Sequence, residues 1–203
     1  MTSSTIDLDT ELSAVNSILG SIGQSPITSI NYNNPEVSFV YNLLKESNID
    51  IQSEGWSFNK EDHVTLSPDV NGYITIPQNA LQYSFHDGLR NKSQRLVRRN
   101  GRLYDTVDHT DVFTTNVSVD VVWLYELGDL PQAFRRYIIY TASTRAATQL
   151  VGNPQLARLL SQQEALARAT CLEYECNQGN HSMFNFPEDS SFTTYPPWRT
   201  LRR

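Results

Sequence analysis

The sequence predicts an α+β fold, in which an antiparallel helical bundle from the N- and C-terminal helices carries an inserted antiparallel β-sheet or small barrel. Before Gly55 and after Gly128, apolar residues recur three and four positions apart, which is typical of amphipathic helices. Between these glycines apolar residues alternate, which is typical of half-buried strands. We therefore expect four segments: N-terminal bundle helices at 1–54, a β-rich insertion at 55–127, a helical hairpin at 128–179, and an extended docking tail at 180–203.

The first two helices are predicted from apolar periodicity and from residues that begin or end helices. The first helix is expected from Leu8 to about residue 22, with Gly20 and Gly23 ending it. The second is expected to continue to about residue 53. Asn34 would cap its first turn, and Pro35 suits its first position because that position needs no N–H group.

The middle of the chain contains short apolar runs separated by turn residues, which favours antiparallel strands. A Pro-Asp-Val-Asn-Gly turn at 68–72 predicts that the flanking runs, 61–66 and 73–76, pair as a hairpin. Asn100-Gly101 predicts a second hairpin, because a two-residue turn of this kind needs positive φ at both positions. The expected strands are 61–66, 73–76, 81–85, 94–99, 102–105, 112–114 and 117–123.

The last two helices are expected to form an antiparallel hairpin, because only a few residues separate them. Asp129 is placed to cap the first of the pair, and Gly152 to end it. Asn153 and Pro154 repeat the cap of the second helix, which predicts a fourth helix reaching about residue 178.

The fourth helix is the longest predicted element, and its apolar stripe is expected to face the other helices. On this prediction Leu159 and Leu166 are both buried. The predicted inner face consists of Leu156, Leu159, Leu160, Gln163, Leu166, Ala167, Thr170 and Tyr174.

The composition is that of a globular protein, with 203 residues, 39% hydrophobic and 19% charged. A net charge of −6 argues against general nucleic-acid coating, which requires a basic surface. The sequence contains no apolar run long enough for a membrane span and no signal peptide, so we expect no membrane partner and synthesis in a cytosol-like compartment. Cys171 and Cys176 are expected to be buried thiols rather than a disulfide or metal pair.

Several segments together resemble the tail tubular protein A family of T7-like short-tailed phages, the head-to-tail adaptor family. They include Glu-Gly-Trp-Ser-Phe-Asn at 54–59 and Leu-Ser-Pro-Asp-Val-Asn-Gly-Tyr-Ile at 66–74. Further similar segments occur in the same order at 19–26, 102–105, 109–114 and 130–135, so that the resemblance covers roughly residues 10 to 180.

The resemblance implies a structural virion protein rather than an enzyme. It implies a ring of twelve subunits that binds the portal on one side and the nozzle, tail tubular protein B, on the other. It also implies that the ring helps to anchor the tail fibres, lets genomic DNA pass through its lumen without sequence-specific binding, and is assembled in the host cytoplasm.

A basic hairpin is the strongest charge feature of the sequence. Residues 90–102 contain six basic residues and no acidic one. Three interpretations remain open: a solubilising sheet edge, a contact with an acidic partner, or a contact with DNA phosphates without interleaved aromatic residues. The candidate site residues here are Arg95, Arg98, Arg99 and Arg102, beside Arg90 and Lys92.

The last part of the chain, 181–203, combines five aromatic residues with three prolines and shows no periodicity. Solvated linkers are poor in aromatic residues, so we expect this tail to dock on a partner, the portal or a neighbouring subunit. The candidate partner-binding residues are Tyr195, Trp198, Arg199, Arg202 and Arg203.

We find no constellation of residues typical of a catalytic, cofactor or metal site. The four histidines, at 63, 86, 109 and 181, have no second ligand at metal-binding spacing. Two alternatives to the adaptor remain: a nucleic-acid-binding module that uses the hairpin, and a hydrolase that uses carboxylates from separate elements. The acids considered for the hydrolase are Glu61, Asp62, Glu173 and Glu175.

Overall fold

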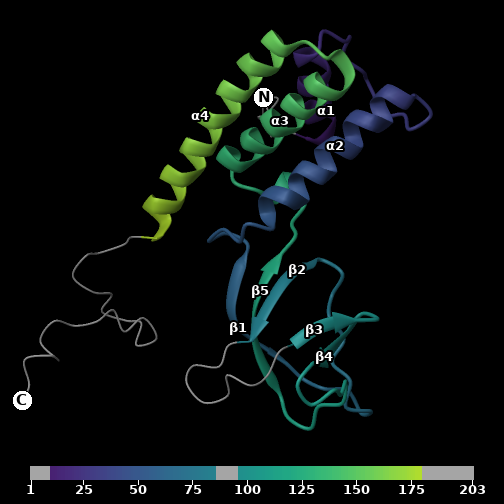
Figure 1. Ribbon diagram of the computed structural model, residues 1–203, viewed down its shortest axis with the longest axis vertical. Coiled ribbons are helices and arrows are strands. Elements are labelled where there is room, and N and C mark those ends of the chain that lie inside the picture. Colours follow the sequence, from purple (N-terminus) through teal and green to yellow (C-terminus); the bar gives the residue numbers. More distant parts are fainter. Residues whose placement is uncertain (1–9, 86–95, 180–203) are drawn as a thin grey trace, which may run out of the picture.

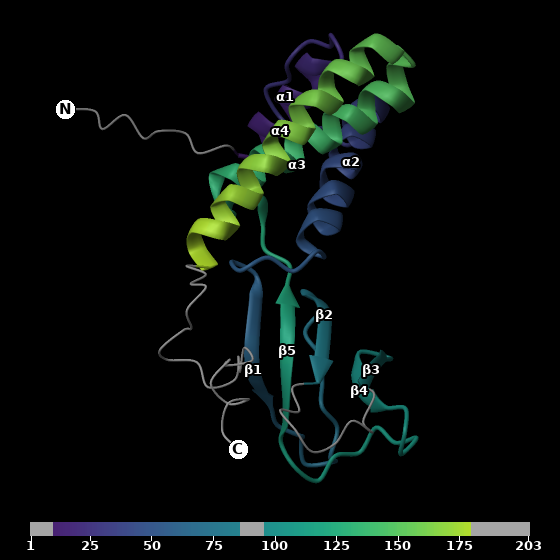
Figure 2. The ribbon, with the colours of Figure 1, turned by 60° about the vertical axis from the view of Figure 1, so that its left-hand side comes forward.

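The computed structural model describes residues 10–85 and 96–179, in which helices gather at one end and strands at the other (Figure 1). The helices are α1 (Glu11–Ser21), α2 (Pro35–Gln52), α3 (Gln132–Ala146) and α4 (Pro154–Gly179). The strands are β1 (Lys60–Leu66), β2 (Ala80–Phe85), β3 (Leu96–Arg99), β4 (Arg102–Asp105) and β5 (Val117–Trp123). The predicted α+β class is confirmed, because helices from both ends of the chain share one bundle (Figure 2).

The ends of α1 and α2 follow from local chemistry. Thr10 caps α1, and its hydroxyl accepts a hydrogen bond from the Ser13 amide at 3.3 Å. Gly23 follows the helix with φ of +80°, while Gly20 lies within α1 and does not end it. The predicted Asn34 cap of α2 is confirmed, since its side chain accepts from the Glu36 amide at 3.1 Å.

The predicted Asp129 cap of α3 is wrong. Asp129 lies in a short 3₁₀ turn, Leu127–Asp129, and α3 begins later, with Pro131 at its N-cap and no side-chain hydrogen bond there. The end of the helix is as expected. A π-helical turn, Ala147–Val151, extends α3, and Gly152 follows with φ of +64°, in the left-handed region that glycine adopts readily.

The core of the bundle is centred on Phe134, which is fully buried. Its ring lies 4.9 Å from that of Trp56, 4.6 Å from that of Phe58 and 5.8 Å from that of Tyr174. The first two of these rings come from the connection between α2 and β1. The inserted region therefore contributes side chains to the bundle before its strands begin.

The predicted inner face of α4 is partly wrong. Leu160, Ala167 and Cys171 are buried, whereas Leu159 is 61% exposed and Leu166 is 70% exposed. Because each helical residue turns the chain by about 100°, Leu159 and Leu166 lie one step around the helix from the buried stripe. Cys171 is buried as expected, but Cys176 is exposed, and both are free thiols.

The three-stranded antiparallel sheet has the order β1-β5-β2. Lys60 pairs with Val122, and Leu66 pairs with Val117, so that the last strand of the region lies in the middle. Strands β3 and β4 form a separate hairpin, whose Asn100 and Gly101 have φ values of 52° and 75°. The turn predicted at Asn100-Gly101 is confirmed.

The predicted pairing of 61–66 with 73–76 is wrong, although the turn between them is present. Asp69 accepts hydrogen bonds from the amides of Asn71 and Tyr73, and Gly72 has φ of +82°. The chain after this turn forms only isolated bridges, from Tyr73 to Val112 and from Thr75 to Arg102. The segments 73–76 and 112–114 are therefore not strands, because β5 takes the place beside β1.

A second core holds the β region together. Its buried residues are Ile74, Ile76, Ala80, Leu103, Val117, Val119 and Val121. Two buried amide side chains join this region to the bundle. Gln52 exchanges two 2.9 Å hydrogen bonds with the backbone of Tyr125, and Asn59 donates to the carbonyl oxygens of Gln52 and Trp123, both at 2.9 Å.

Candidate functional site

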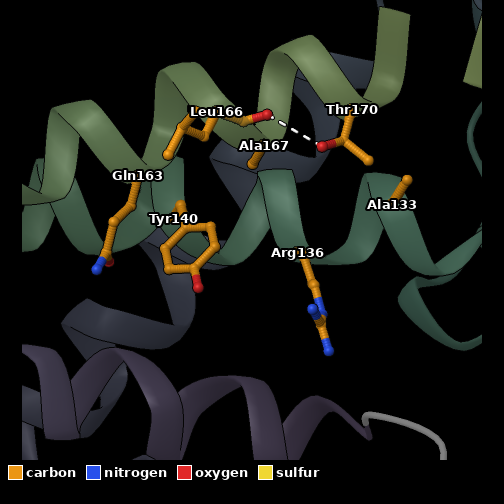
Figure 3. A pocket seen from close by; sticks show the side chains of 7 residues that line it. All are labelled: Ala133, Arg136, Tyr140, Gln163, Leu166, Ala167 and Thr170. Carbon is orange, nitrogen blue, oxygen red and sulfur yellow. Dashed lines mark hydrogen bonds between the residues drawn. The ribbon is translucent and has the colours of Figure 1, made fainter. Parts of the chain in front are cut away.

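A groove of about 240 Å³ lies between α3 and α4 on the outer surface of the bundle (Figure 3). Tyr140 and Arg136 on α3 and Gln163 on α4 point toward the same side of it. The described residues that line this groove are Ala133, Arg136, Tyr140, Gln163, Leu166, Ala167 and Thr170.

A second hollow, of about 370 Å³, continues the first toward α1. It is bounded by Ser17 and Ser21 of α1 and shares Arg136, Tyr140 and Gln163 with the first. We call the two together the bundle groove. It runs along the bundle with α3 as its floor and with α1 and α4 as its walls.

Arg136 is the one charged residue among the described residues that line the bundle groove. Its side chain is exposed and makes no hydrogen bond or ion pair with any residue that the structure describes. The neighbouring Arg135 is only 6% exposed, and its Nε and Nη1 also have no described hydrogen-bond partner. Arg136 therefore adds an unpaired positive charge to a groove whose other lining residues are apolar or uncharged, which suits an acidic partner.

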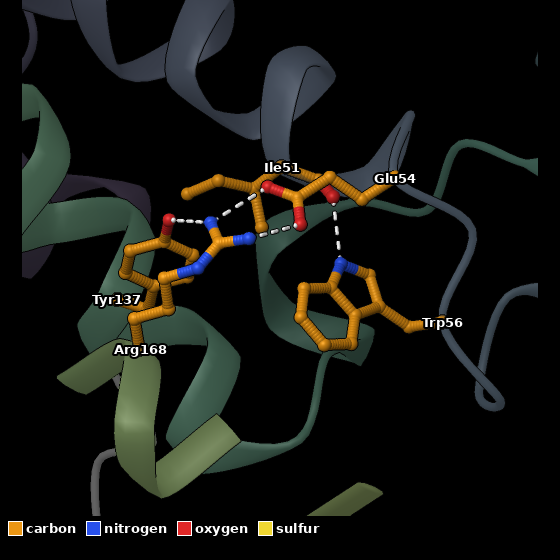
Figure 4. Close-up of polar contacts among 5 residues, drawn as sticks. All are labelled: Ile51, Glu54, Trp56, Tyr137 and Arg168. Atoms are coloured by element: carbon orange, nitrogen blue, oxygen red, sulfur yellow. Dashed lines mark hydrogen bonds and ion pairs between the residues drawn. The ribbon is translucent and has the colours of Figure 1, made fainter. Parts of the chain in front are cut away.

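On another side of α4, Arg168 fixes the helix to both α3 and the end of α2 (Figure 4). Its guanidinium donates to both Glu54 carboxylate oxygens, at 3.0 and 2.8 Å, and to the Tyr137 hydroxyl at 2.6 Å. The bonds to Glu54 and then to Tyr137 raise the pKa of Arg168. Nearby, the Trp56 indole donates to the Ile51 carbonyl at 2.7 Å. The charges of Arg168 and Glu54 are therefore paired within the subunit.

Two arginines of the basic hairpin pack against tyrosine rings. The Arg99 guanidinium lies 4.1 Å from the Tyr104 ring centroid, and that of Arg102 lies 3.9 Å from the Tyr73 ring centroid. Arg102 also lies 3.8 Å from Asp111, in a half-exposed pair that contributes little to stability. Both tyrosines lie outside residues 90–102, so that no aromatic residue is interleaved among these arginines, yet two aromatic rings pack against them.

A family model of tail tubular proteins matches residues 12–181, which span both the bundle and the sheet. The chain belongs to the tail tubular protein family. It is also 25% identical over 169 residues to tail tubular protein A of Klebsiella phage KP34, covering 83% of this chain and 88% of that protein. This tail tubular protein is thus a structural component of a phage tail.

The structure places three of the predicted site residues of this tail tubular protein. Arg98, Arg99 and Arg102 lie on one hairpin, and the first two are exposed on β3. Outside the described residues lie Arg95 of the hairpin and all the predicted partner-binding residues, Tyr195, Trp198, Arg199, Arg202 and Arg203.

The bundle groove was missed at the sequence level, because Leu159 and Leu166 were assigned to the core. A signal for it is present in α4. The positions 159, 163, 166 and 170, which share one side of the helix, contain no charged residue. A solvated helix face normally carries charges.

Three of the four acids considered for a hydrolase make contacts within the subunit, and the fourth, Glu173, is exposed. Glu61 accepts a hydrogen bond from the Trp123 indole at 2.9 Å, and Asp62 pairs with Lys60 at 3.0 Å. Glu175 accepts from the amide and the hydroxyl of Ser57. Among the described residues there is no group of three or more metal-ligating side chains, and no described helix is long and apolar enough to cross a membrane.

Proposed function

We propose that this tail tubular protein is the ring-forming adaptor that joins the portal to the nozzle, tail tubular protein B, of a short-tailed phage. The observation that carries the proposal is the family match over residues 12–181, which includes every described helix and strand except the first residue of α1. We further propose a ring of twelve subunits, an accessory role in anchoring tail fibres, and assembly in the host cytoplasm.

A ring requires heterologous contacts, in which two different faces of each subunit meet. The bundle groove supports the proposal because it offers one such face, with the exposed Leu166 and the unpaired Arg136. The subunit is also elongated, with the bundle and the sheet at opposite ends (Figure 1). Its two ends can therefore contact different neighbours along the tail.

We propose that genomic DNA passes through the lumen of the ring without being retained there. The net charge of −6 supports this, because an acidic or neutral wall does not retain phosphates. Two arginines of the hairpin, Arg99 and Arg102, lie against tyrosine rings, and Arg102 is also paired with Asp111. We therefore propose that the hairpin contacts a protein partner.

A nucleic-acid-binding module is the second candidate function, because Arg98, Arg99 and Arg102 bring three guanidinium groups onto one hairpin. Measuring how tightly the purified chain binds DNA distinguishes the adaptor from the nucleic-acid-binding module. The adaptor predicts weak binding that does not depend on these residues. Tight, salt-sensitive binding that is lost in Arg98→Ala/Arg99→Ala would support the module instead.

The C-terminal tail is proposed to dock on the portal or on a neighbouring subunit through Tyr195, Trp198, Arg199, Arg202 and Arg203. Deleting residues 190–203 tests this. The melting temperature of the subunit should stay nearly unchanged, while attachment to the portal or to the ring is lost. Unfolding of the truncated chain would show instead that the tail belongs to the core.

The adaptor proposal is tested by assembling particles without this chain. Such particles should retain the portal and lack the nozzle, and added purified chain should restore nozzle attachment. Particles that still carry the nozzle in the absence of the chain would contradict the proposal.

A further inference from the structure

The bundle groove and the outer face of α2 lie on opposite sides of α3. Arg145 marks the α2 side, because it pairs with Asp50 of α2 at 2.8 Å. Arg136 lies about 180° around the helix from Arg145, at about 100° per residue. Figure 1 likewise shows α3 between α4 and α2.

The side of α4 that borders the groove is suited to a protein contact. Leu159 and Leu166 are 61% and 70% exposed, and no charged residue shares this side of the helix between them. The charges nearby are used elsewhere, since Glu164 accepts from Thr141 and Arg168 pairs with Glu54. Exposed apolar residues without charges are typical of the centre of an interface.

The outer face of α2 has complementary chemistry. Asn42, Glu46 and Ile49 follow each other at helical spacing and are all exposed, Ile49 by 42%. Glu46 makes no hydrogen bond or ion pair with a residue in the described part of the chain. Lys45 is also exposed on this side, and its ammonium lies 4.5 Å from the centroid of the Tyr41 ring. The face thus presents Ile49 and an unpaired Glu46 carboxylate, with Lys45 held against Tyr41, whereas the groove presents apolar residues beside an unpaired guanidinium.

We propose that the bundle groove of one subunit receives the outer face of α2 from the next copy of this chain, with Ile49 against Leu166 and Glu46 paired with Arg136. The inference rests on the proposed ring and names its contact. Neighbours in a ring of twelve differ in orientation by only about 30°, so the two faces that meet must point in nearly opposite directions. The groove and the outer face of α2 meet this condition.

Charge reversal tests the pairing. The test uses tail-less particles that carry the portal, and it measures how many copies of purified chain bind to each and at what concentration. Arg136→Glu and Glu46→Arg should each raise the concentration needed for ring formation by about tenfold or more, because like charges then meet. The combined variant should restore binding. Both side chains are exposed, so the melting temperature of each subunit should not change.

Photocrosslinking shows which segment occupies the bundle groove. Leu166 is replaced by p-benzoylphenylalanine, and a mixture of isotopically light and heavy chains is assembled and irradiated. The expected product joins position 166 of one copy to the α2 peptide that contains Glu46 and Ile49 of another. The control places the same residue at position 172, where Leu172 is 48% exposed about 120° around α4, and should not give this product.

The outcomes separate the inference from the adaptor proposal. If particles show a ring but position 166 crosslinks to residues 180–203, to the portal or to nothing, the inference is wrong and the adaptor proposal stands. The inference is also wrong if the charge reversals leave ring formation unchanged. If the chain forms no ring on the portal, both fail together.

Discussion

The helical bundle and the β region differ in how their sequences determine their structures. In the bundle, helix ends follow from adjacent residues such as Asn34, and a large core surrounds Phe134. In the β region, β1 pairs with β5, so that Lys60 meets Val122 across most of the insertion. The bundle is therefore encoded by local signals, and the β region by contacts that no local signal reveals.

The two cores also differ in size. Among the described residues, the bundle core contains twenty buried residues and the β core seven, and the amide side chains of Gln52 and Asn59 lie between them. We propose that the boundaries at 54/55 and 127/128 separate two units of unequal stability. The bundle should be the more stable unit, because burial of apolar area dominates folding.

The largest effect is expected at the centre of the bundle. Phe134→Ala should lower the free energy of unfolding by about 3 to 5 kcal/mol, through lost burial and the cavity among the three surrounding rings. Denaturant unfolding measures this. Val70→Ala is the control, because Val70 is fully exposed. A loss no larger than that of the control would contradict the assigned core.

A smaller and more local effect is expected in the β core. Leu103→Ala, at a fully buried position, should cost about 2 to 4 kcal/mol. Native-state hydrogen exchange should show lost protection in the strands while α3 remains protected. Equal loss of protection in both regions would show instead that they unfold as a single unit.

The smallest effects on stability are expected on the outer side of α4. Leu159→Ala and Leu166→Ala should each change the free energy of unfolding by less than about 0.5 kcal/mol, as is usual for surface positions. Leu160→Ala is the matched buried control, since Leu160 is 7% exposed. It should cost about 2 kcal/mol or more. Equal costs at 159, 160 and 166 would contradict the orientation of α4.

The two cysteines distinguish the two sides of α4 chemically. Burial raises the pKa of Cys171 from 9.0 to about 12, whereas Cys176 is exposed. A thiol reagent should therefore modify only Cys176 in the native protein and both in denaturant. Because the pKa of Cys171 is higher in the folded state, its contribution to stability is complete below pH 9 and falls as pH rises toward 12. Cys171→Ala should weaken this alkaline loss. Rapid modification of both thiols in the native protein would contradict the burial.

The sequence predicted most of the bundle, because Asn34, Gly152 and Asn153 act on the residues beside them. It also predicted the Asn100-Gly101 turn for the same reason. It could not predict that Tyr73 lies against Arg102, because that contact depends on a distant bridge between Thr75 and Arg102.

The sequence analysis missed the bundle groove for another reason. The apolar stripe of α4 is wider than the surface that α3 covers, so periodicity alone does not decide which leucines are buried. Leu160 and Leu166 both border the groove, but Leu160 is 7% exposed, whereas Leu166, about 120° around the helix, is 70% exposed. The uncharged side of α4 indicates such a surface, but the packing of α3 against α4 decides which of the leucines are exposed.

Electron cryomicroscopy of the assembled tail tests the central claim most directly. The account predicts a closed ring of twelve copies between the portal and the nozzle, with a lumen wide enough for duplex DNA and with adjacent bundles in side-by-side contact. A tail in which this chain is absent from that position, or is present only as separate subunits that do not close a ring, would contradict it.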